Sequence, residues 1–445
     1  MDGEGPRDYR TRMKKVLMVV FHYPPWSGGS AVHRTLKFTK HLPGFGWQPI
    51  VLAPSPRAYP KNGVSPSAIP EGIEVVRSFA LDTAQHLAFR GSHLKFMSLP
   101  DRWISWWPSA VATGLNLARR HKPNVIWSTY PVATTHLIGL TLQRLSGLPW
   151  VADFRDPMKE VDPRTGEEFP EDATTRKVNG WIERPTLKHC SRAVFTTPGA
   201  LRMYASRFPE IPSSRWAVIP NGYDEEDFLA AEREANFQRP TGDTVCLLHS
   251  GLLYPYVRDP TCFFSALSDL RRAEQVTPST LKIVLRASGF EQLYRPQLES
   301  LGISDIVFLE PAVSHKESLI EMMNADGLLI FQASNCNWQI PAKLYECLRA
   351  RRPILAITDR EGDTAAVLRS EGIDSIVSLH SKEEIAEGLM KFISAVRKRQ
   401  HSARAVEHYS RKARTQELAL LLDSVCERNV SALATTKQEP TLTLH

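Results

Sequence analysis

The chain has 445 residues, of which 42% are hydrophobic and 23% are charged, a balance typical of a globular protein with two or three domains. No apolar run approaches the roughly 18 residues that cross a bilayer, and the short run at residues 16–21 is not a signal peptide, so we expect a cytoplasmic protein. The net charge of +7 suits an anionic partner, either a nucleotide phosphate or an acidic membrane surface. Nucleic acid is the least favoured partner, because the sequence contains no recognisable nucleic-acid module.

The first predicted elements are a strand, a glycine loop and a helix. Residues 16–21 are rich in β-branched side chains, which is typical of a strand buried on both faces. Gly28 and Gly29 follow, and Ser30 is a suitable N-cap for a helix that ends before Pro43. This order favours anion binding, because free amides and the helix dipole point outward; a tight turn without a ligand is the alternative.

The rest of the N-terminal half alternates short apolar runs with helical patterns, among them residues 109–120 and 134–146. Such alternation predicts right-handed βαβ units and a parallel sheet that is covered on both faces. The predicted strands lie at residues 16–21, 49–54, 73–78, 124–129, 149–154, 193–197 and 216–221.

The connection at residues 80–108 is unusually long, and loops of this length are often functional. Trp103, Trp106 and Trp107 lie beside Arg102 near its end. Their indole rings suit either a membrane interface or packing in the core.

A polar segment at residues 224–243 interrupts the alternation, which then restarts. The later predicted strands lie at residues 244–251, 281–288, 306–311, 327–332, 353–358 and 375–379. The simplest fold is α/β, with two doubly wound Rossmann-like domains that face each other across a cleft, at residues 14–235 and 236–395. We expect residues 396–430 to be a helical segment packed back on the first domain, and residues 431–445 to be a disordered tail.

Six segments carry a further likeness: FHYPPWSGGSAVHRTLKFTKHLPGFGWQPIVL, STYPVATTHLIG, WVADFRDP, VIPNGYDEEDF, HSGLLYPYVRDP and IPAKLYECLRARRPILAI. In their order and intervals they resemble the GT-B-fold retaining glycosyltransferases of the family 4 type. The likeness extends over nearly the whole chain. It implies that the first domain holds an acceptor and that the second holds most of a nucleoside-diphosphate sugar.

The resemblance implies several donor-binding residues. Gly28 and Gly29 would approach the donor diphosphate or sugar. In HSGLLYPYVRDP, Gly251 and Arg258 take the places of the family's glycine and basic residue. A guanidinium suits a diphosphate, because it is always charged and can bond two oxygens at once. The alternative for Arg258 is a surface arginine paired with the neighbouring aspartate.

The segment IPAKLYECLRARRPILAI resembles the one whose glutamate binds the donor ribose. Glu346 takes that place, and Lys343 lies one turn earlier on the same helix face. An ordinary intrahelical pair between the two is the alternative. Relatives commonly carry a second glutamate eight positions earlier, where this chain has Trp338, so that contact to the sugar hydroxyls is not implied.

The segment WVADFRDP resembles the one whose histidine often lies beside the reacting sugar. Arg155 occupies that position between Asp153 and Asp156, and these three residues are the catalytic candidates. A carboxylate at this strand end suits either orienting substrate hydroxyls or holding Arg155 in a structural ion pair. His136 is interpreted as a helix-packing residue.

The sequence predicts neither a metal nor a cofactor. It has no Asp-x-Asp motif, and its six cysteines include no C-x-x-C pair, which argues against a metal-bridged diphosphate, a zinc site and a disulfide framework. Charge on a departing nucleoside diphosphate would instead be stabilised by Arg258, Lys343 and helix-terminal amides.

The resemblance therefore implies a metal-independent, retaining, hexosyl-type glycosyltransferase that moves a sugar from a nucleoside-diphosphate sugar to a hydroxyl acceptor. The acceptor is expected to be a saccharide or a lipid-linked glycan of polysaccharide or glycoconjugate biosynthesis, with the protein peripheral on the inner face of the membrane. Two alternatives remain: a nucleotide-sugar epimerase with the same fold, and a binding protein that has lost catalysis. The second is suggested by Arg155 and Trp338, which replace two common acids or bases.

Overall fold

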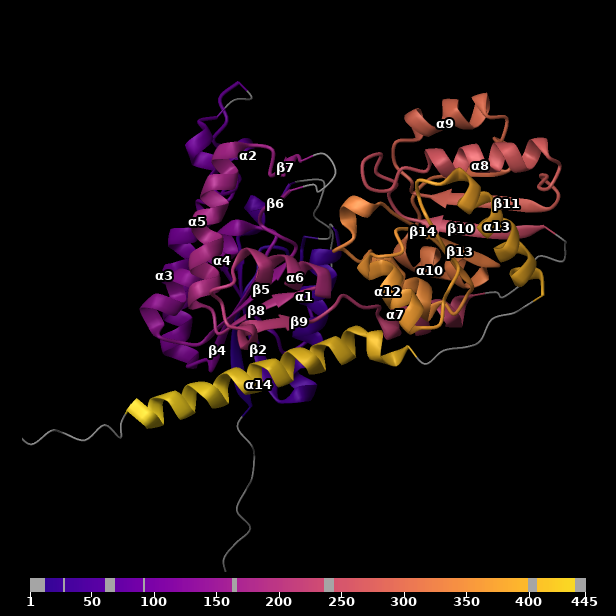
Figure 1. Cartoon of the computed structure of the whole chain (residues 1–445). Helices are drawn as coiled ribbons and strands as arrows, with labels where there is room; N and C mark the ends of the chain where they lie inside the picture. The colour runs from indigo at the N-terminus through magenta and orange to yellow at the C-terminus, as the bar shows by residue number, and fades with distance from the viewer. Residues whose placement is uncertain are drawn as a thin grey trace, which may run out of the picture.

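The computed structural model describes residues 13–26, 29–60, 69–90, 93–161, 166–235, 244–398 and 406–436. Within these residues the chain forms two parallel sheets, each with helices on both faces, joined side by side (Figure 1). The α/β fold class with two doubly wound Rossmann-like domains is therefore confirmed.

The first sheet has seven parallel strands in the order β3-β2-β1-β4-β5-β8-β9. All seven match strands that the sequence predicts, because short apolar runs between helical patterns can bury both faces only in such a sheet. Their bounds are β1 Lys14–Val19, β2 Trp47–Pro54, β3 Glu74–Ser78, β4 Val125–Thr129, β5 Trp150–Arg155, β8 Arg192–Phe195 and β9 Trp216–Val218. A short antiparallel pair, β6 (Glu160–Val161) and β7 (Glu168–Phe169), lies outside this sheet.

Helices cover both faces of the first sheet. One face packs against α3 Trp106–His121, α4 Ala133–Ser146, α5 Ala173–His189 and α6 Pro198–Arg207. The other face packs against α1 (Gly29–His41) and α14 (Arg411–Thr436). Because α1 begins at Gly29, Ser30 lies inside the first helical turn, and the expectation that Ser30 is the N-cap is wrong.

The second sheet has six parallel strands in the order β12-β11-β10-β13-β14-β15. Their bounds are β10 Val245–Ser250, β11 Leu281–Arg286, β12 Val307–Glu310, β13 Gly327–Gln332, β14 Ile354–Thr358 and β15 Ile376–Val377. One face packs against α8 Thr261–Arg272, α9 Glu291–Ser300 and α13 Lys382–Arg397. The other packs against α7 Glu225–Glu234, α10 His315–Asn324, α11 Ala342–Arg349 and α12 Asp363–Ser370.

Two observed boundaries differ from the expected ones. The division expected at residues 235 and 236 places α7 in the N-terminal domain. In the structure, Phe228 and Ala231 of α7 pack into the core of the second sheet. The chain therefore crosses between the sheets before α7. Helix α14 runs back along the first domain as expected (Figure 1), but it continues to Thr436, so residues 431–436 are not part of a disordered tail. Residues 437–445 lie outside the described residues.

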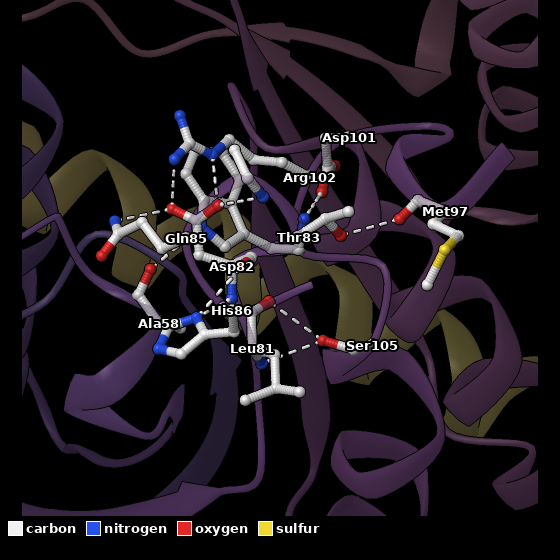
Figure 2. A network of polar contacts seen from close by, with 12 residues as sticks. Ala58, Leu81, Asp82, Thr83, Gln85, His86, Met97, Asp101, Arg102 and Ser105 are labelled. Carbon is white, nitrogen blue, oxygen red and sulfur yellow. Dashed lines mark hydrogen bonds and ion pairs between the residues drawn. The ribbon is translucent and has the colours of Figure 1, made fainter. Parts of the chain in front are cut away.

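The long connection between β3 and α3 is held at its base by buried polar contacts (Figure 2). It includes the one-turn helix α2 (Thr83–His86). The carboxylate of Asp82 is fully buried, and the guanidinium of Arg102 binds both of its oxygens. Thr83 donates to the carbonyl of Met97 at 2.8 Å. These contacts join the two ends of the connection, so that its base is fixed to the first domain.

The three tryptophans at the end of this connection are core residues. Trp106 is fully buried and its indole donates to Ser78 at 2.8 Å. The indole of Trp103 donates to the carbonyl of Ala58 at 3.0 Å, and Trp107 also packs against the core. These indole rings therefore pack in the core of the first domain and do not form a membrane interface.

A buried guanidinium joins the first helix, the first sheet and the crossover to the second domain. Arg34 of α1 is 2% exposed, and its Nη2 donates to Asp153 at 3.1 Å and to the carbonyl of Ile219 at 2.9 Å. Its Nε donates to Asp153 at 3.2 Å, and its Nη1 donates to the carbonyl of Pro220 at 3.0 Å. The carboxylate of Asp153 accepts a further hydrogen bond from the hydroxyl of Thr129 at 3.0 Å. Both charges are therefore compensated by protein groups.

Replacing Arg34 by Ala should destabilise the first domain strongly. The change leaves the carboxylate of Asp153 buried without its cation, and breaking one partner of a buried pair costs roughly 3–5 kcal/mol. Denaturation followed by tryptophan fluorescence measures this domain, because every tryptophan except Trp338 lies in it. The exposed Arg119 on α3 provides the control, and its Ala variant should lie within about 0.5 kcal/mol of the parent. A loss below about 1 kcal/mol for the Arg34 variant would contradict the assignment.

Candidate functional site

A cavity of about 370 Å³ in the second domain brings together three of the predicted donor residues. Gly251, Arg258 and Lys343 all line it, although they come from two segments almost ninety residues apart. It lies where β10 and β13 end and α11 begins, which is the usual ligand position in a parallel sheet. The other lining residues are mostly apolar: Leu252, Tyr254, Met322, Leu328, Leu329, Ile330, Phe331, Pro341, Ala342, Leu344 and Cys347, with His249 and Ser250.

Arg258 lies in the cavity with only neutral partners among the described residues. Its Nε donates to the amide oxygen of Gln332 at 3.3 Å, and its Nη1 donates to the carbonyl of Leu252 at 3.3 Å. The expected alternative, a pair with Asp259, is not observed; that carboxylate accepts from Thr261 instead. Burial lowers the pKa of Arg258, because the protein around the guanidinium removes water that would stabilise its charge. An anion in the cavity would supply the missing partner.

Gly251 has a backbone conformation that side chains rarely adopt. Its φ is +140°, and its amide donates to the carbonyl of Arg286 at 3.0 Å. A Cβ at this position would meet no atom within 4 Å, so the restriction comes from the backbone and not from crowding. The open space beside Gly251 allows a ligand to approach the main chain.

Lys343 and Glu346 form the intrahelical pair that the sequence leaves open as an alternative. Their Nζ and Oε2 atoms are 2.8 Å apart, and Nζ also lies 3.5 Å from the hydroxyl of Ser318. The amine therefore lies at the cavity, whereas Glu346 is not one of the residues that line it. The side chain of Glu346 is only 15% exposed and lies near His33 of the first domain, so it points toward the junction between the domains.

The first helix faces this part of the second domain. The rings of His33 on α1 and His315 on α10 are 5.9 Å apart. Loss of hydration between the domains, together with Arg411 and His315, lowers the pKa of His33 to about 4. Gly29 is the first residue of α1, and Gly28 lies outside the described residues. The approach of these two glycines to a donor stays a prediction.

The three catalytic candidates have different surroundings. Asp153 is fully buried, and its principal partner is Arg34. One interpretation of the sequence had instead paired this carboxylate with Arg155. Asp156 is an exposed residue, yet protein around its carboxylate removes enough water to raise its pKa, and the nearby Arg155 opposes that shift. Of the two carboxylates, only Asp156 is therefore accessible to a substrate.

Arg155 is held in a strained position at the end of β5. Its φ of +58° is in the left-handed region, at a shift in register between β5 and β8. A residue other than glycine is uncommon in this region, and the strain it stores is one feature of functional sites. Its carbonyl accepts from Thr196 at 3.0 Å, and burial lowers the pKa of its guanidinium. Burial and Arg155 together lower the pKa of the neighbouring His22 to about 4, so this imidazole is neutral.

The two domains also contact each other through α6. Gly199 donates its amide to Asp363 at 2.5 Å, and Arg202 pairs with the same carboxylate at 2.9 Å. A Cβ on Gly199 would lie 2.7 Å from the Cα of Trp338, so only glycine allows this approach. The carbonyl of Trp338 accepts from Thr197 at 2.5 Å. The residue that replaces the family's second glutamate is thus an interdomain contact.

Beside this contact lies a second cavity, of about 490 Å³, lined by residues of both domains. It begins three residues after Asp156, and Trp338 contributes to it from the second domain. Its other lining residues are Lys159, Glu160, Val161, Glu168, Arg176, Lys177, Met203 and Arg207.

Sequence reasoning missed four charged or titratable residues around the candidate site: His22, His33, Arg34 and Arg411. Of these, only Arg34 carries a usable signal in the sequence. It lies one turn before Phe38 on the buried side of α1, and its guanidinium stacks on that ring at 4.8 Å.

His136, by contrast, is the packing residue that the sequence indicated. It is fully buried, and its Nδ1 lies 2.9 Å from the hydroxyl of Ser128. Burial lowers the pKa of His136 to about 3, so the imidazole is neutral and carries no charge into the core.

Neither metal ligands nor membrane helices were found in the described part of the chain. No group of three or more His, Cys, Asp or Glu side chains there is arranged to hold a metal ion. None of the helices in the same residues combines the length and apolarity that a membrane crossing requires.

Solved structures share this architecture at low sequence identity. Sucrose-phosphate synthase from Thermosynechococcus elongatus has a TM-score of 0.59 at 13% identity, covering 95% of this chain and 99% of that one. The lipopolysaccharide outer core galactosyltransferase WaaB has a TM-score of 0.59 at 12% identity, covering 92% and 99%. HepE from Anabaena, in complex with UDP, has a TM-score of 0.54 at 13% identity, covering 95% and 100%. These likenesses establish the fold.

The sequence itself matches one family model. Residues 28–222 match the glycosyl transferase 4-like domain, which begins at the glycine loop and ends at the crossover between the sheets. No curated protein matches the sequence. This match over residues 28–222 agrees with the resemblance inferred from the six segments, and the solved structures share the two-domain fold.

Proposed function

We propose that this protein is a retaining, metal-independent, hexosyl-type glycosyltransferase that transfers a sugar from a nucleoside-diphosphate sugar to a hydroxyl acceptor. The observation that carries the proposal is the cavity in which Gly251, Arg258 and Lys343 meet, with Arg258 lacking an acidic partner among the described residues. A UDP-sugar donor is supported by the solved structures of HepE with UDP, with UDP and glucose, and with UDP-glucose.

In the proposed complex, the diphosphate lies between Arg258 and Lys343. Both cations stabilise the charge that develops as the bond between the sugar C1 and the β-phosphate oxygen breaks. The acceptor hydroxyl attacks C1 from the face that the phosphate leaves, and its proton passes to a β-phosphate oxygen. The configuration at C1 is then retained. No metal is needed for this charge stabilisation, because two cationic side chains already line the cavity.

The residues of the first domain would act on the sugar and the acceptor. Asp156 is the carboxylate accessible to a substrate, and we assign it the orientation of hydroxyl groups. Arg155 is held rigidly beside it, and Asp153 positions Arg34.

The remaining donor contacts are assigned by the family resemblance. Glu346 is assigned to the donor ribose, with Gly28 and Gly29 near the diphosphate or sugar. An epimerase acting on the donor alone and an inactive binding protein are the alternatives, and detection of a glycosylated acceptor excludes both.

We further propose that the acceptor is a lipid-linked saccharide of polysaccharide or glycoconjugate biosynthesis, and that the protein works in the cytoplasm against the inner membrane face. The net charge of +7 supports an anionic surface. Large apolar side chains at the tip of the connection support it too, since Leu87, Phe89, Leu94 and Phe96 are 40% to 78% exposed. Arg90 lies over the ring of Phe89 at 5.5 Å.

Replacing Arg258 by Ala should weaken UDP binding. The variant loses a charge-assisted bond, which contributes roughly 1.5–3 kcal/mol, so affinity measured by calorimetry should fall by about tenfold or more. Replacing Glu346 by Gln keeps the shape but weakens the ribose bonds, so a smaller loss is expected. The exposed Arg295 on α9 is the matched control, and its Ala variant should bind UDP like the parent. Unchanged affinity in the Glu346 variant would remove the ribose assignment, and unchanged affinity in the Arg258 variant would remove the diphosphate assignment.

Transfer should survive removal of divalent metal. Chelation with EDTA should leave the rate of sugar transfer unchanged, because the proposed diphosphate contacts are all made by side chains and amides. The rate is measured with and without EDTA, and then with added magnesium or manganese. A loss of turnover that either metal restores would show that the diphosphate is held differently.

Binding to anionic vesicles should depend on the tip of the connection. Replacing both Phe89 and Phe96 by Ser should reduce co-sedimentation with vesicles of phosphatidylcholine and phosphatidylglycerol, because the variant loses the apolar contacts. Leu145 on α4 is similarly exposed at 62%, and its Ser variant serves as the control. Failure of the parent to sediment with these vesicles would contradict the membrane proposal.

A further inference from the structure

The second cavity, which has no part in the functions assigned above, is formed by both domains. We call it the junction cavity; it has a volume of about 490 Å³ and is lined by the segment after Asp156, by α5, by α6 and by Trp338 of the second domain. The antiparallel pair of β6 and β7 contributes to its wall. A cavity of this size at a boundary between domains is typical of a small-molecule site.

The junction cavity lies close to both parts of the candidate site. Trp338 is three residues before Pro341, which lines the proposed donor cavity of Arg258, and three residues of chain span at most about 11 Å. Lys159 is likewise three residues after Asp156. The lining of the junction cavity therefore begins within that distance of the donor cavity on one side and of the accessible carboxylate on the other.

Cations predominate among the charged side chains of the junction cavity. The lining includes two carboxylates and four cations: Glu160, Glu168, Lys159, Arg176, Lys177 and Arg207. The two arginines have acidic partners, since Arg176 pairs with Glu168 at 2.6 Å and Arg207 pairs with a buried glutamate of α5 at 2.7 Å. Among the described residues, neither lysine has a carboxylate within 4.0 Å. The two lysines are therefore the cations left to bind a ligand.

The ammonium group of Lys159 lies against α5. A Cβ on Gly180 would be only 3.2 Å from Nζ of Lys159, so the lysine side chain crosses the helix where no side chain is present. The backbone of Lys159 is fixed as well, because its carbonyl accepts from Arg207 at 2.8 Å. Lys177 is one turn before Gly180 on the same helix, and its Nζ lies 5.4 Å from the centre of the Trp181 ring. Both ammonium groups are thus carried by the same part of the cavity wall.

The remaining lining residues suit a sugar ring. Val161, Met203 and Trp338 supply apolar surface against which the C–H groups of a pyranose can pack, as apolar lining does in most ligand sites. A phosphate or carboxylate on such a ring would form charge-assisted hydrogen bonds with the ammonium groups. A neutral sugar would leave both ammonium groups without an anionic partner.

We propose that the junction cavity binds the acceptor, and that the acceptor is an anionic saccharide whose phosphate or carboxylate contacts Lys159 and Lys177. This inference rests on the proposed glycosyltransferase function and specifies its acceptor class. The two lysines are specificity-determining residues: they select the charged group of the acceptor and make no contact with the donor diphosphate, which lies in the other cavity.

Calorimetry with three monosaccharide probes tests the proposal, with UDP at saturation so that the donor cavity is filled. Glucose 1-phosphate carries a phosphate, methyl glucuronide carries a carboxylate, and methyl glucoside is the neutral reference. The parent should bind at least one charged probe more tightly than methyl glucoside by about tenfold, the contribution of one charge-assisted contact. A preference for glucose 1-phosphate identifies a phosphate, such as one that links a saccharide to a lipid, and a preference for methyl glucuronide identifies an acidic sugar.

Variants of the two lysines assign the preference to the junction cavity. The double variant Lys159→Gln with Lys177→Gln should bind charged and neutral probes equally and should bind UDP like the parent. The double variant with Arg at both positions should keep the preference, because the positive charges remain. Lys188→Gln, at the exposed far end of α5, is the matched control and should behave like the parent.

Three outcomes overturn the inference. The first is that the parent binds UDP but neither charged probe more tightly than the neutral one, which leaves the proposed function standing. The second is a preference that survives in the Gln double variant, which would place the charged group elsewhere. The third is an equal loss of affinity for UDP and all probes in that variant, which would give the lysines a structural role. Absence of UDP binding by the parent overturns the proposed function as well, and thermal unfolding of each variant separates loss of fold from loss of binding.

Discussion

The buried contacts of Arg34 fix the first helix to the first sheet and to the crossover that leads to the second domain. One guanidinium binds the carboxylate at the end of β5 and two carbonyl groups of the crossover, at Ile219 and Pro220. The helix that carries it also reaches α7 of the second domain, where Lys37 pairs with Asp224 and Lys40 with Glu226. The same helix therefore contacts both the first sheet and the second domain.

The two sides of the candidate site are built differently. On the proposed donor side, Arg258 has only neutral partners among the described residues, whereas Lys343 is paired with Glu346. On the other side, charges are mostly buried, and Arg155 is held in a strained conformation beside Asp156.

Much of the fold could be predicted because its determinants are local in the sequence. The strands of both sheets match predicted ones, since a short apolar run between helical patterns has few other ways to bury both faces. The assignment of α7 failed for the opposite reason. Its charged surface resembles a linker, and only the packing of Phe228 and Ala231 places the helix in the second domain. The start of α1 at Gly29 was missed by two residues, within the usual uncertainty of helix ends.

The sequence by itself determined the fold class and the motifs that carry Gly251, Arg258 and Lys343, because each depends on residues close together along the chain. The tertiary structure alone decided which charges are paired. It joined Asp153 to Arg34, turned Glu346 toward the junction, and placed Arg411 there from a helix that begins sixty-five residues later. Electrostatic partners act across space over a few ångströms, and residues distant in sequence become neighbours only when both sheets and α14 have packed.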